Sequence, residues 1–129
     1  MTSEYTQQVA QIAGPLEAAM DAMAGTLSAN QEVVLHNLTT PEHSIIKIIN
    51  GHVSGRGNGD HLLAGPEKDT GFALLLQKTN NNKPRTISDY KTVTASGKTL
   101  NSASTIYYSE EGYPLIAFCI NVDPSPYEQ

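Results

Sequence analysis

The last third of the chain contains three short β-type runs joined by tight turns, and this pattern restricts the fold more than any other feature. The runs cover residues 86–94, 102–109 and 115–122, and the turns lie at Ala95–Lys98 and Glu110–Tyr113. Parallel neighbours need a crossover of a dozen or more residues, whereas antiparallel neighbours need only a short turn. The pattern therefore predicts three consecutive antiparallel strands.

Two earlier runs extend this sheet. Residues 32–38 are rich in β-branched and aliphatic side chains, and residues 44–50 are apolar at most positions. Between them Thr39–Glu42 includes a proline and is typical of a turn. We expect a hairpin here, which gives the sheet five strands.

The N-terminal segment has the spacing of a helix. Its apolar residues recur at intervals of 3, 4, 4, 3 and 4, at Val9, Ile12, Leu16, Met20, Met23 and Leu27. Gly14 and Pro15 interrupt the pattern, so we predict one helix to about Ile12 and a second from Pro15 to about Leu27. The apolar stripe either covers the sheet of its own domain or forms a contact between two copies.

The middle of the chain is irregular and rich in glycine from Gly51 to Gly71. A short helical turn near residues 60–63 and a helix from Asp69 or Thr70 to Leu76 are expected there. The order of elements predicts an α+β fold, a five-stranded antiparallel sheet with its helices on one side.

Composition excludes several classes of protein. The chain has eight Lys and Arg residues and thirteen Asp and Glu residues, and the resulting formal charge of −5 disfavours direct binding to nucleic acid. A single cysteine, Cys119, allows no internal disulfide. The N-terminus lacks the features of a signal peptide, and no apolar run approaches the length of a membrane span. We expect a soluble, cytoplasmic, single-domain chain with no membrane partner.

No motif points to catalysis. The four histidines His36, His43, His52 and His61 are spaced by 7, 9 and 9 residues, which matches no metal-ligand signature. Gly97–Lys98–Thr99 lacks the upstream glycine of a phosphate-binding loop, because position 92 is threonine. We expect no enzyme, cofactor or metal; a small metal-dependent enzyme stays a remote alternative that depends on the histidines alone.

The final strand has two unlike faces. Ile116, Phe118, Ile120 and Val122 point to one side, and Ala117, Cys119, Asn121 and Asp123 point to the other. A face of small and polar side chains either meets solvent or leaves room for a ligand beneath a cover. The glycine-rich stretch 51–71 could supply that cover.

The segments Glu32–Asn37, Ser44–Ile45, Asn50–Arg56 and Cys119–Asp123 together resemble the YheO-like PAS domain family. Tyr90, Gly97–Lys98 and Ser104–Thr105 add weaker support between them, and the similarity runs from about Pro15 to Asp123. The resemblance implies a PAS fold, a five-stranded antiparallel sheet with helices between its second and third strands. In two places the chain departs from the family, at Asp89, where Asn is more frequent, and at Ser102–Thr105.

The resemblance also implies a set of ligand-facing residues and a function. Arg56 is the most interesting, because it is a rare cation in a glycine-rich loop and suits a carboxylate or phosphate, although it could equally pin that loop. The candidate ligand-binding residues are His36, Asn37, Ser44, Asn50, His52, Arg56, Tyr90, Ser104, Thr105, Cys119 and Asn121. Of these, Asn50 is expected to bind backbone rather than ligand.

We expect a sensory domain of a bacterial transcriptional regulator that binds a small polar metabolite, anionic ones included, and forms a homodimer. DNA would be bound only by a helix-turn-helix segment that this chain lacks, so the chain is either an excised domain or a short form. The predicted divisions are a helical extension (1–14), a PAS-like sensor domain (15–123) and a tail (124–129). A protein–protein interaction module without a ligand is the alternative.

Overall fold

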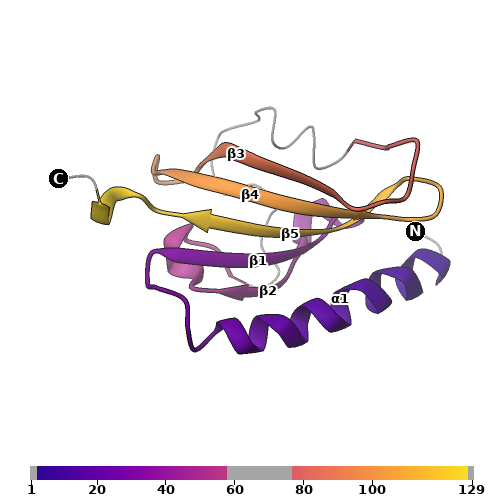
Figure 1. Cartoon of the computed structure of the whole chain (residues 1–129), viewed down its shortest axis with the longest axis horizontal. Coiled ribbons are helices and arrows are strands. Elements are labelled where there is room, and N and C mark those ends of the chain that lie inside the picture. Colours follow the sequence, from indigo (N-terminus) through magenta and orange to yellow (C-terminus); the bar gives the residue numbers. More distant parts are fainter. Residues whose placement is uncertain (1–2, 58–76, 128–129) are drawn as a thin grey trace.

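The computed structural model describes residues 3–57 and 77–127, which form one helix packed on a five-stranded antiparallel sheet. Figure 1 shows the helix α1 (Ser3–Met23) as a single rod along one face of the sheet. The strands are β1 (Gln31–Asn37), β2 (Ile45–Ile49), β3 (Arg85–Val93), β4 (Thr99–Tyr108) and β5 (Pro114–Val122). The described residues also include three short 3₁₀ helices. They are η1 (Pro41–His43) between β1 and β2, η2 (Gly51–Val53) after β2 and η3 (Ser125–Tyr127) after β5.

The strand order is β2-β1-β5-β4-β3, and every neighbouring pair is antiparallel. The first and last strands therefore lie side by side in the centre, and each hairpin extends outward from them. All five strands occur where the sequence predicts them, with β4 beginning three residues earlier than expected. The predicted α+β fold is confirmed. The helical segments expected at residues 60–63 and 69–76 lie outside the described residues.

The predicted break at Gly14–Pro15 is wrong, because α1 continues through both residues. Pro15 lies on the exposed side of the helix, while Ala13 and Met20 are buried against the sheet. Burial of the same apolar stripe before and after the proline offsets the missing backbone hydrogen bond. The helix ends at Met23, earlier than the predicted Leu27, just before Gly25.

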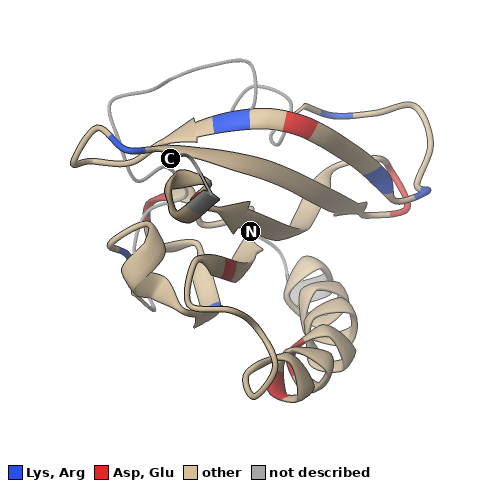
Figure 2. Cartoon of the chain, turned by 60° about the vertical axis from the view of Figure 1, so that its left-hand side comes forward, with Lys and Arg blue, Asp and Glu red and all other residues tan. Residues whose placement is uncertain are grey.

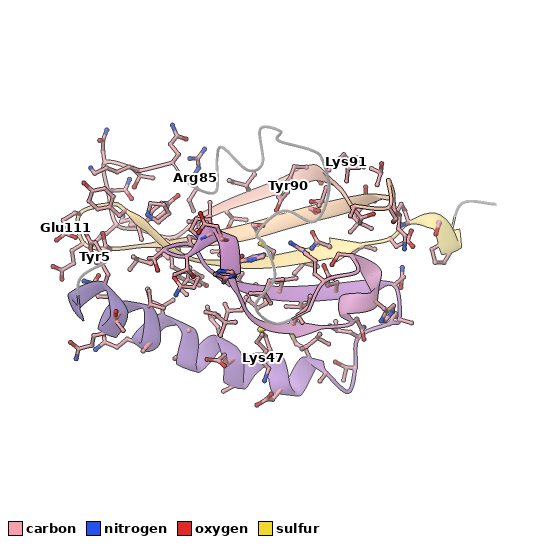
Figure 3. The ribbon with its side chains drawn as sticks, turned by 180° about the vertical axis from the view of Figure 1, so that it is seen from behind. Tyr5, Lys47, Arg85, Tyr90, Lys91 and Glu111 are labelled. Carbon is pink, nitrogen blue, oxygen red and sulfur yellow. The ribbon has the colours of Figure 1, made fainter. Side chains whose placement is uncertain are left out.

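One end of α1 contacts the turn between β4 and β5, and the other contacts β2; Figure 3 shows Tyr5 close to Glu111. Near its start, the Tyr5 hydroxyl donates to Glu111 at 3.4 Å, and the Tyr5 ring lies 6.2 Å from that of Tyr113. Near its end, Asp21 pairs with Lys47 of β2. The core between helix and sheet includes Val33, Leu35, Leu115 and Ile116. This helix-covered side of the sheet is called the outer face below.

Pro15 generates a stability prediction. Replacing it with alanine restores a backbone donor and removes a ring clash on an exposed surface, so Pro15→Ala should raise the free energy of unfolding by about 1–3 kcal/mol. Urea denaturation measures the change. Gln11→Ala, also exposed and one turn away, should change stability by less than about 0.5 kcal/mol. An unchanged or lower stability of Pro15→Ala would show that the proline is accommodated without cost.

Candidate functional site

The sheet face opposite α1 carries a mixture of buried polar and small side chains and is called the inner face below. Strand alternation places alternate residues of β1, β4 and β5 on it. Its members on these strands are Glu32, Val34, His36, Leu100, Ser102, Ser104, Ile106, Tyr108, Ala117, Cys119 and Asn121, all of them buried. The two-faced pattern predicted for the final strand is confirmed, since Ile116 and Phe118 pack on the helix side.

A chain of hydrogen bonds crosses four strands at one end of the inner face. Asn121 Nδ2 donates to Glu32 Oε1 at 2.7 Å, and Ser102 Oγ donates to Asn121 Oδ1 at 2.7 Å. Thr92 Oγ1 lies 2.7 Å from Ser102 Oγ. Register explains the alignment, because Asn121 is paired with Glu32 on one side and with Ser102 on the other. The chain links β1, β5, β4 and β3 through their side chains.

The loop after β2 closes over the end of this chain. Both the backbone nitrogen and the hydroxyl of Ser54 donate to Glu32 Oε2, the former at 3.2 Å. Arg56 Nε donates to Ser54 Oγ at 3.1 Å, and Arg56 Nη2 lies 3.5 Å from Glu32 Oε1. The side chains of Arg56 and Glu32 are 6% and 0% exposed, so the ion pair is withdrawn from water.

The path of this loop depends on two residues. Asn50 adopts the left-handed conformation with φ of 60°, and its Nδ2 donates to the Gln31 carbonyl at 2.8 Å and the Ser28 carbonyl at 3.0 Å. The Gly51 carbonyl accepts from the backbone nitrogens of Gly55 at 2.7 Å and Arg56 at 3.1 Å. A Cβ on Gly51 would lie 2.3 Å from the Arg56 carbonyl oxygen. Glycine at this position therefore lets the loop fold back and bring Arg56 to Glu32.

A second polar group lies next to the first, toward the middle of the inner face. Tyr90 Oη and Ser104 Oγ are 2.5 Å apart, and Ser104 Oγ donates to Cys119 Sγ at 2.9 Å. Burial raises the pKa of the Cys119 thiol, against smaller lowering effects from Ser104 and the Arg56 charge. The cysteine is thus a neutral thiol and not an activated nucleophile.

His36 is neutral for a related reason. Its Nδ1 lies 2.8 Å from Ser44 Oγ, and the side chain is buried in the sheet. Burial, followed by the positive charge of Arg56, lowers the pKa of His36 to about 3.

The inner face brings together seven of the eleven predicted residues: His36, Ser44, Arg56, Tyr90, Ser104, Cys119 and Asn121. The other four lie elsewhere. Asn37 Oδ1 accepts from the backbone and hydroxyl of Thr39, and Asn50 binds backbone, as expected. His52 Nε2 lies 2.7 Å from the Ala29 carbonyl, and Thr105 pairs with Thr86 at 3.0 Å on the opposite face of the sheet from Ser104.

Sequence reasoning missed Glu32, Ser54, Ser102 and Thr92. Glu32 is the most important omission, because its carboxylate joins the loop to the sheet. A signal was present, since Glu32 is two residues from Val34 on the same strand face and a charged residue in that phase is unusual. Ser54 could have been noted as two residues before Arg56, but nothing in the sequence pairs either with Glu32.

Metal and nucleic-acid sites find no support in the described part of the chain. Within residues 3–57 and 77–127, no three His, Cys, Asp or Glu side chains form a group that could hold a metal ion. His61 lies outside those residues. Figure 2 shows Lys and Arg residues scattered over loops and the β3 side of the sheet rather than gathered on one surface. None of the described helices is long and apolar enough to cross a membrane.

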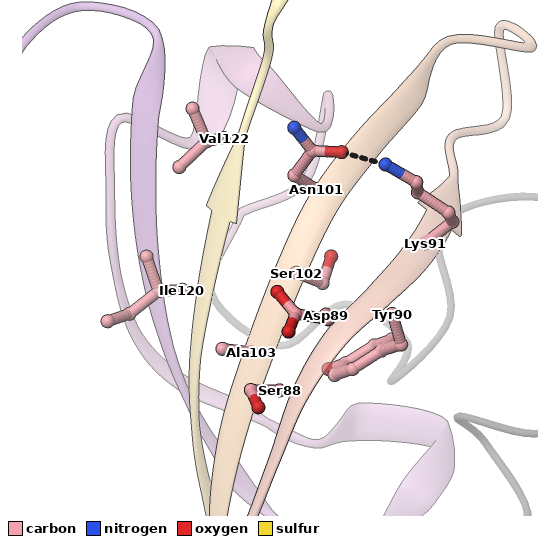
Figure 4. A pocket seen from close by; sticks show the side chains of 9 residues that line it. All are labelled: Ser88, Asp89, Tyr90, Lys91, Asn101, Ser102, Ala103, Ile120 and Val122. Carbon is pink, nitrogen blue, oxygen red and sulfur yellow. Dashed lines mark hydrogen bonds between the residues drawn. The ribbon is translucent and has the colours of Figure 1, made fainter.

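The outer face has a shallow hollow of about 390 Å³ beyond the reach of α1 (Figure 4). Ile120 and Val122 of β5 and Ala103 of β4 form its apolar part. Its rim includes a bulge in β3, where the register shifts between Ile87 and Tyr90 and Asp89 has a φ of 58°. Asp and Asn tolerate this conformation better than most residues, which accounts for an acidic or amide side chain at this position.

Comparison with known proteins identifies the family of this chain. The YheO-like PAS domain family matches residues 7–129, and the chain belongs to that family. It is also 28% identical over 120 residues to a protein of Haemophilus influenzae that is named only as uncharacterized. The matched region is 92% of this chain and 50% of that relative, so the chain spans half of the relative's length.

The Glu32 network predicts a large loss of stability on truncation. Glu32→Ala leaves the buried Arg56 charge without the Glu32 carboxylate and removes the acceptor for Ser54 and Asn121, so the free energy of unfolding should fall by about 3–5 kcal/mol. Chemical denaturation checks this. Asp21→Asn removes the exposed ion pair with Lys47, in which Asp21 is 71% exposed, and should cost no more than about 1 kcal/mol. Equal losses in the two variants would contradict the assignment.

Burial of His36 predicts a pH dependence. Because the pKa is about 3 in the folded chain and 6.5 as a reference value, the unfolded chain takes up the proton first as pH falls. Stability is therefore full above pH 6.5 and decreases below it by up to about 1.4 kcal/mol per pH unit, until about pH 3. Urea midpoints at several pH values should show a shallower decrease for His36→Gln than for the wild type. His43→Gln, at an exposed position, should follow the wild-type curve.

Proposed function

We propose that this PAS domain is the sensory part of a bacterial transcriptional regulator and binds a small polar metabolite on its inner face. The observation that carries the proposal is Arg56, a buried cation held by a loop over a sheet face of polar and small side chains. Fold alone does not define a ligand, so the ligand class follows from what Arg56 and its neighbours can bind.

Arg56 suits an anionic group, such as a carboxylate or phosphate. Its planar guanidinium can donate two parallel hydrogen bonds to such a group. The Glu32 carboxylate already accepts three hydrogen bonds from Asn121 and Ser54, and its contact with Arg56 is the longest, at 3.5 Å. Arg56 could therefore turn to a ligand without leaving Glu32 unsatisfied. The nearby negative charge of Glu32 would at the same time select against anions that do not fit closely.

The same loop offers a route from the ligand to the end of the domain. Lys98 Nζ donates to the Val53 carbonyl at 3.4 Å and lies 3.4 Å from Asp123 Oδ2, where the chain leaves β5. Asn30 exchanges two hydrogen bonds with the backbone of Asp123. Figure 1 shows η2 close to this end of β5. A ligand that favours one loop position would shift the population of arrangements at the chain exit. In this proposal a separate DNA-binding segment reads that shift.

A second candidate is an interaction module without a ligand. Ile120 is 41% exposed on the outer face and lines the shallow hollow, which favours contact with another chain there. In that case the inner face would be a structural core. A homodimer is compatible with either candidate, since a sensor also needs a surface through which to pass its signal.

Native mass spectrometry of the purified chain tests the proposal. We expect a small molecule to remain bound to the wild type, or, if the chain is bare, a panel of small carboxylates and phosphates to raise its melting temperature. Arg56→Gln removes a charge-assisted hydrogen bond and should weaken binding by about tenfold to a hundredfold.

Arg85→Gln is the matched control, because it removes an exposed arginine from β3, and it should bind like the wild type. Circular dichroism establishes that both variants are folded. Equal binding by Arg56→Gln and the wild type would remove Arg56 from the site. A bare chain that no member of the panel stabilises would favour the interaction module.

A further inference from the structure

The hydroxyl of Tyr108 is buried and has no hydrogen-bond partner among the described residues. Tyr108 is only 6% exposed and ends β4 on the same face as Ser102, Ser104 and Ile106. It packs in the inner-face cluster that contains Val34, Leu38, Ile45, Ile106, Ala117 and Cys119. The hydroxyl thus lies at the apolar end of the inner face, beyond the Arg56 network.

A buried hydroxyl without a partner lowers the stability of a folded chain. Phenylalanine would fill the same space without that penalty. The other buried hydroxyls of the inner face are all paired, as the contacts of Ser44, Ser102 and Ser104 show. Tyr108 therefore departs from the rule that the rest of this face follows, and a partner from outside the chain would account for it.

The side chains next to Tyr108 on the central strand are small. Ala117 and Cys119 are the small side chains of central strand β5, and they lie between Val34 and His36 on β1 and Ser104 and Ile106 on β4. Small side chains alone do not define a site. Together with an unpaired hydroxyl in the same cluster, they mark a place where the body of a ligand could lie against the sheet.

The surroundings determine what kind of group would fit here. Among the described residues, every side chain of this cluster is uncharged, and His36 beside it is neutral. An ionised group next to Tyr108 would lose its hydration, and none of these described neighbours would supply a charge to pair with it. An uncharged donor or acceptor would lose much less and would gain the Tyr108 hydroxyl as a partner.

We propose that the inner face recognises its ligand at two ends, and that an uncharged carbonyl, hydroxyl or amide of the ligand bonds to Tyr108 Oη at the apolar end. This inference rests on the proposed function and deepens it. The ligand class is a small molecule with an apolar body on Ala117 and Ile106, an uncharged polar group at Tyr108 and a polar or anionic group at Arg56.

Three ring probes of similar size test the assignment by NMR titration of the folded chain. Cyclopentanone and cyclopentanol carry an uncharged polar group, whereas cyclopentanecarboxylate is an anion. The two uncharged probes should shift the backbone amide signals of Tyr108 and Ala117 in a saturable way. Tyr108→Phe should weaken that binding about fivefold, because it removes one neutral hydrogen bond. Tyr107→Phe, on the outer face of the same strand, should leave it unchanged.

A second measurement separates a ligand contact from a structural role. After unfolding and refolding in urea to remove any bound molecule, Tyr108→Phe should be at least as stable as the wild type. A lower urea midpoint would show that the hydroxyl has a partner within the chain and would overturn the proposal. Equal binding of the uncharged probes by Tyr108→Phe and the wild type, or no saturable shift at Tyr108 and Ala117, would overturn it as well.

The carboxylate probe makes the two proposals distinguishable. If the uncharged probes fail but cyclopentanecarboxylate shifts the Ser54 and Arg56 amides, the Tyr108 assignment falls and the proposed sensor function stands. If the uncharged probes bind through Tyr108 and the anion affects neither end, the apolar subsite stands and the role of Arg56 falls.

Discussion

The inner face depends on one interaction, the burial of the Glu32 carboxylate. An ionised carboxyl group inside a protein is costly unless it is surrounded by donors. Here the donors come from two separate elements, since Asn121 belongs to β5 and Ser54 and Arg56 belong to the loop after β2, while the acceptor Glu32 is on β1. The cost of burying this charge is thus met only when the central strands and the loop are assembled together. It makes the position of Arg56 a consequence of the whole fold.

The two faces of the sheet contribute differently to stability, because their side chains differ in size and polarity. On the outer face, bulky residues such as Leu35 and Ile116 fill the space under α1 and stabilise the domain. On the inner face, Ala117, Cys119 and Ser104 occupy the middle and fill much less volume. Stability can therefore come from one face while the other retains polar groups that contribute less to packing. The ligand binding proposed above needs such a face, with polar groups that are not required for packing.

Much of this arrangement could be predicted from the sequence. Short β-type runs bounded by turns identified all five strands, alternation identified the polar side of the last one, and the resemblance added seven residues that do lie on the inner face. The prediction of the helix was less accurate. Proline usually interrupts a helix, but burial of Ala13 and Met20 against the sheet outweighed that tendency. Asn37 and Thr105 have polar side chains that could bind a ligand. The Asn37 side chain instead accepts a hydrogen bond from Thr39 in the following turn, and Thr105 lies on the outer face of the sheet.

The sequence by itself determined the strands, their antiparallel hairpins and which side chains share a strand face, because these follow from a period of two and from turn lengths. Only the tertiary structure decided that Glu32, Ser54, Arg56 and Asn121 meet, since they come from elements far apart in the chain. It also decided that the Tyr108 hydroxyl is buried with no partner among the described residues, while the Tyr90 hydroxyl is paired. Hydrogen-bond satisfaction depends on distances between strands and loops, and no local pattern encodes those distances.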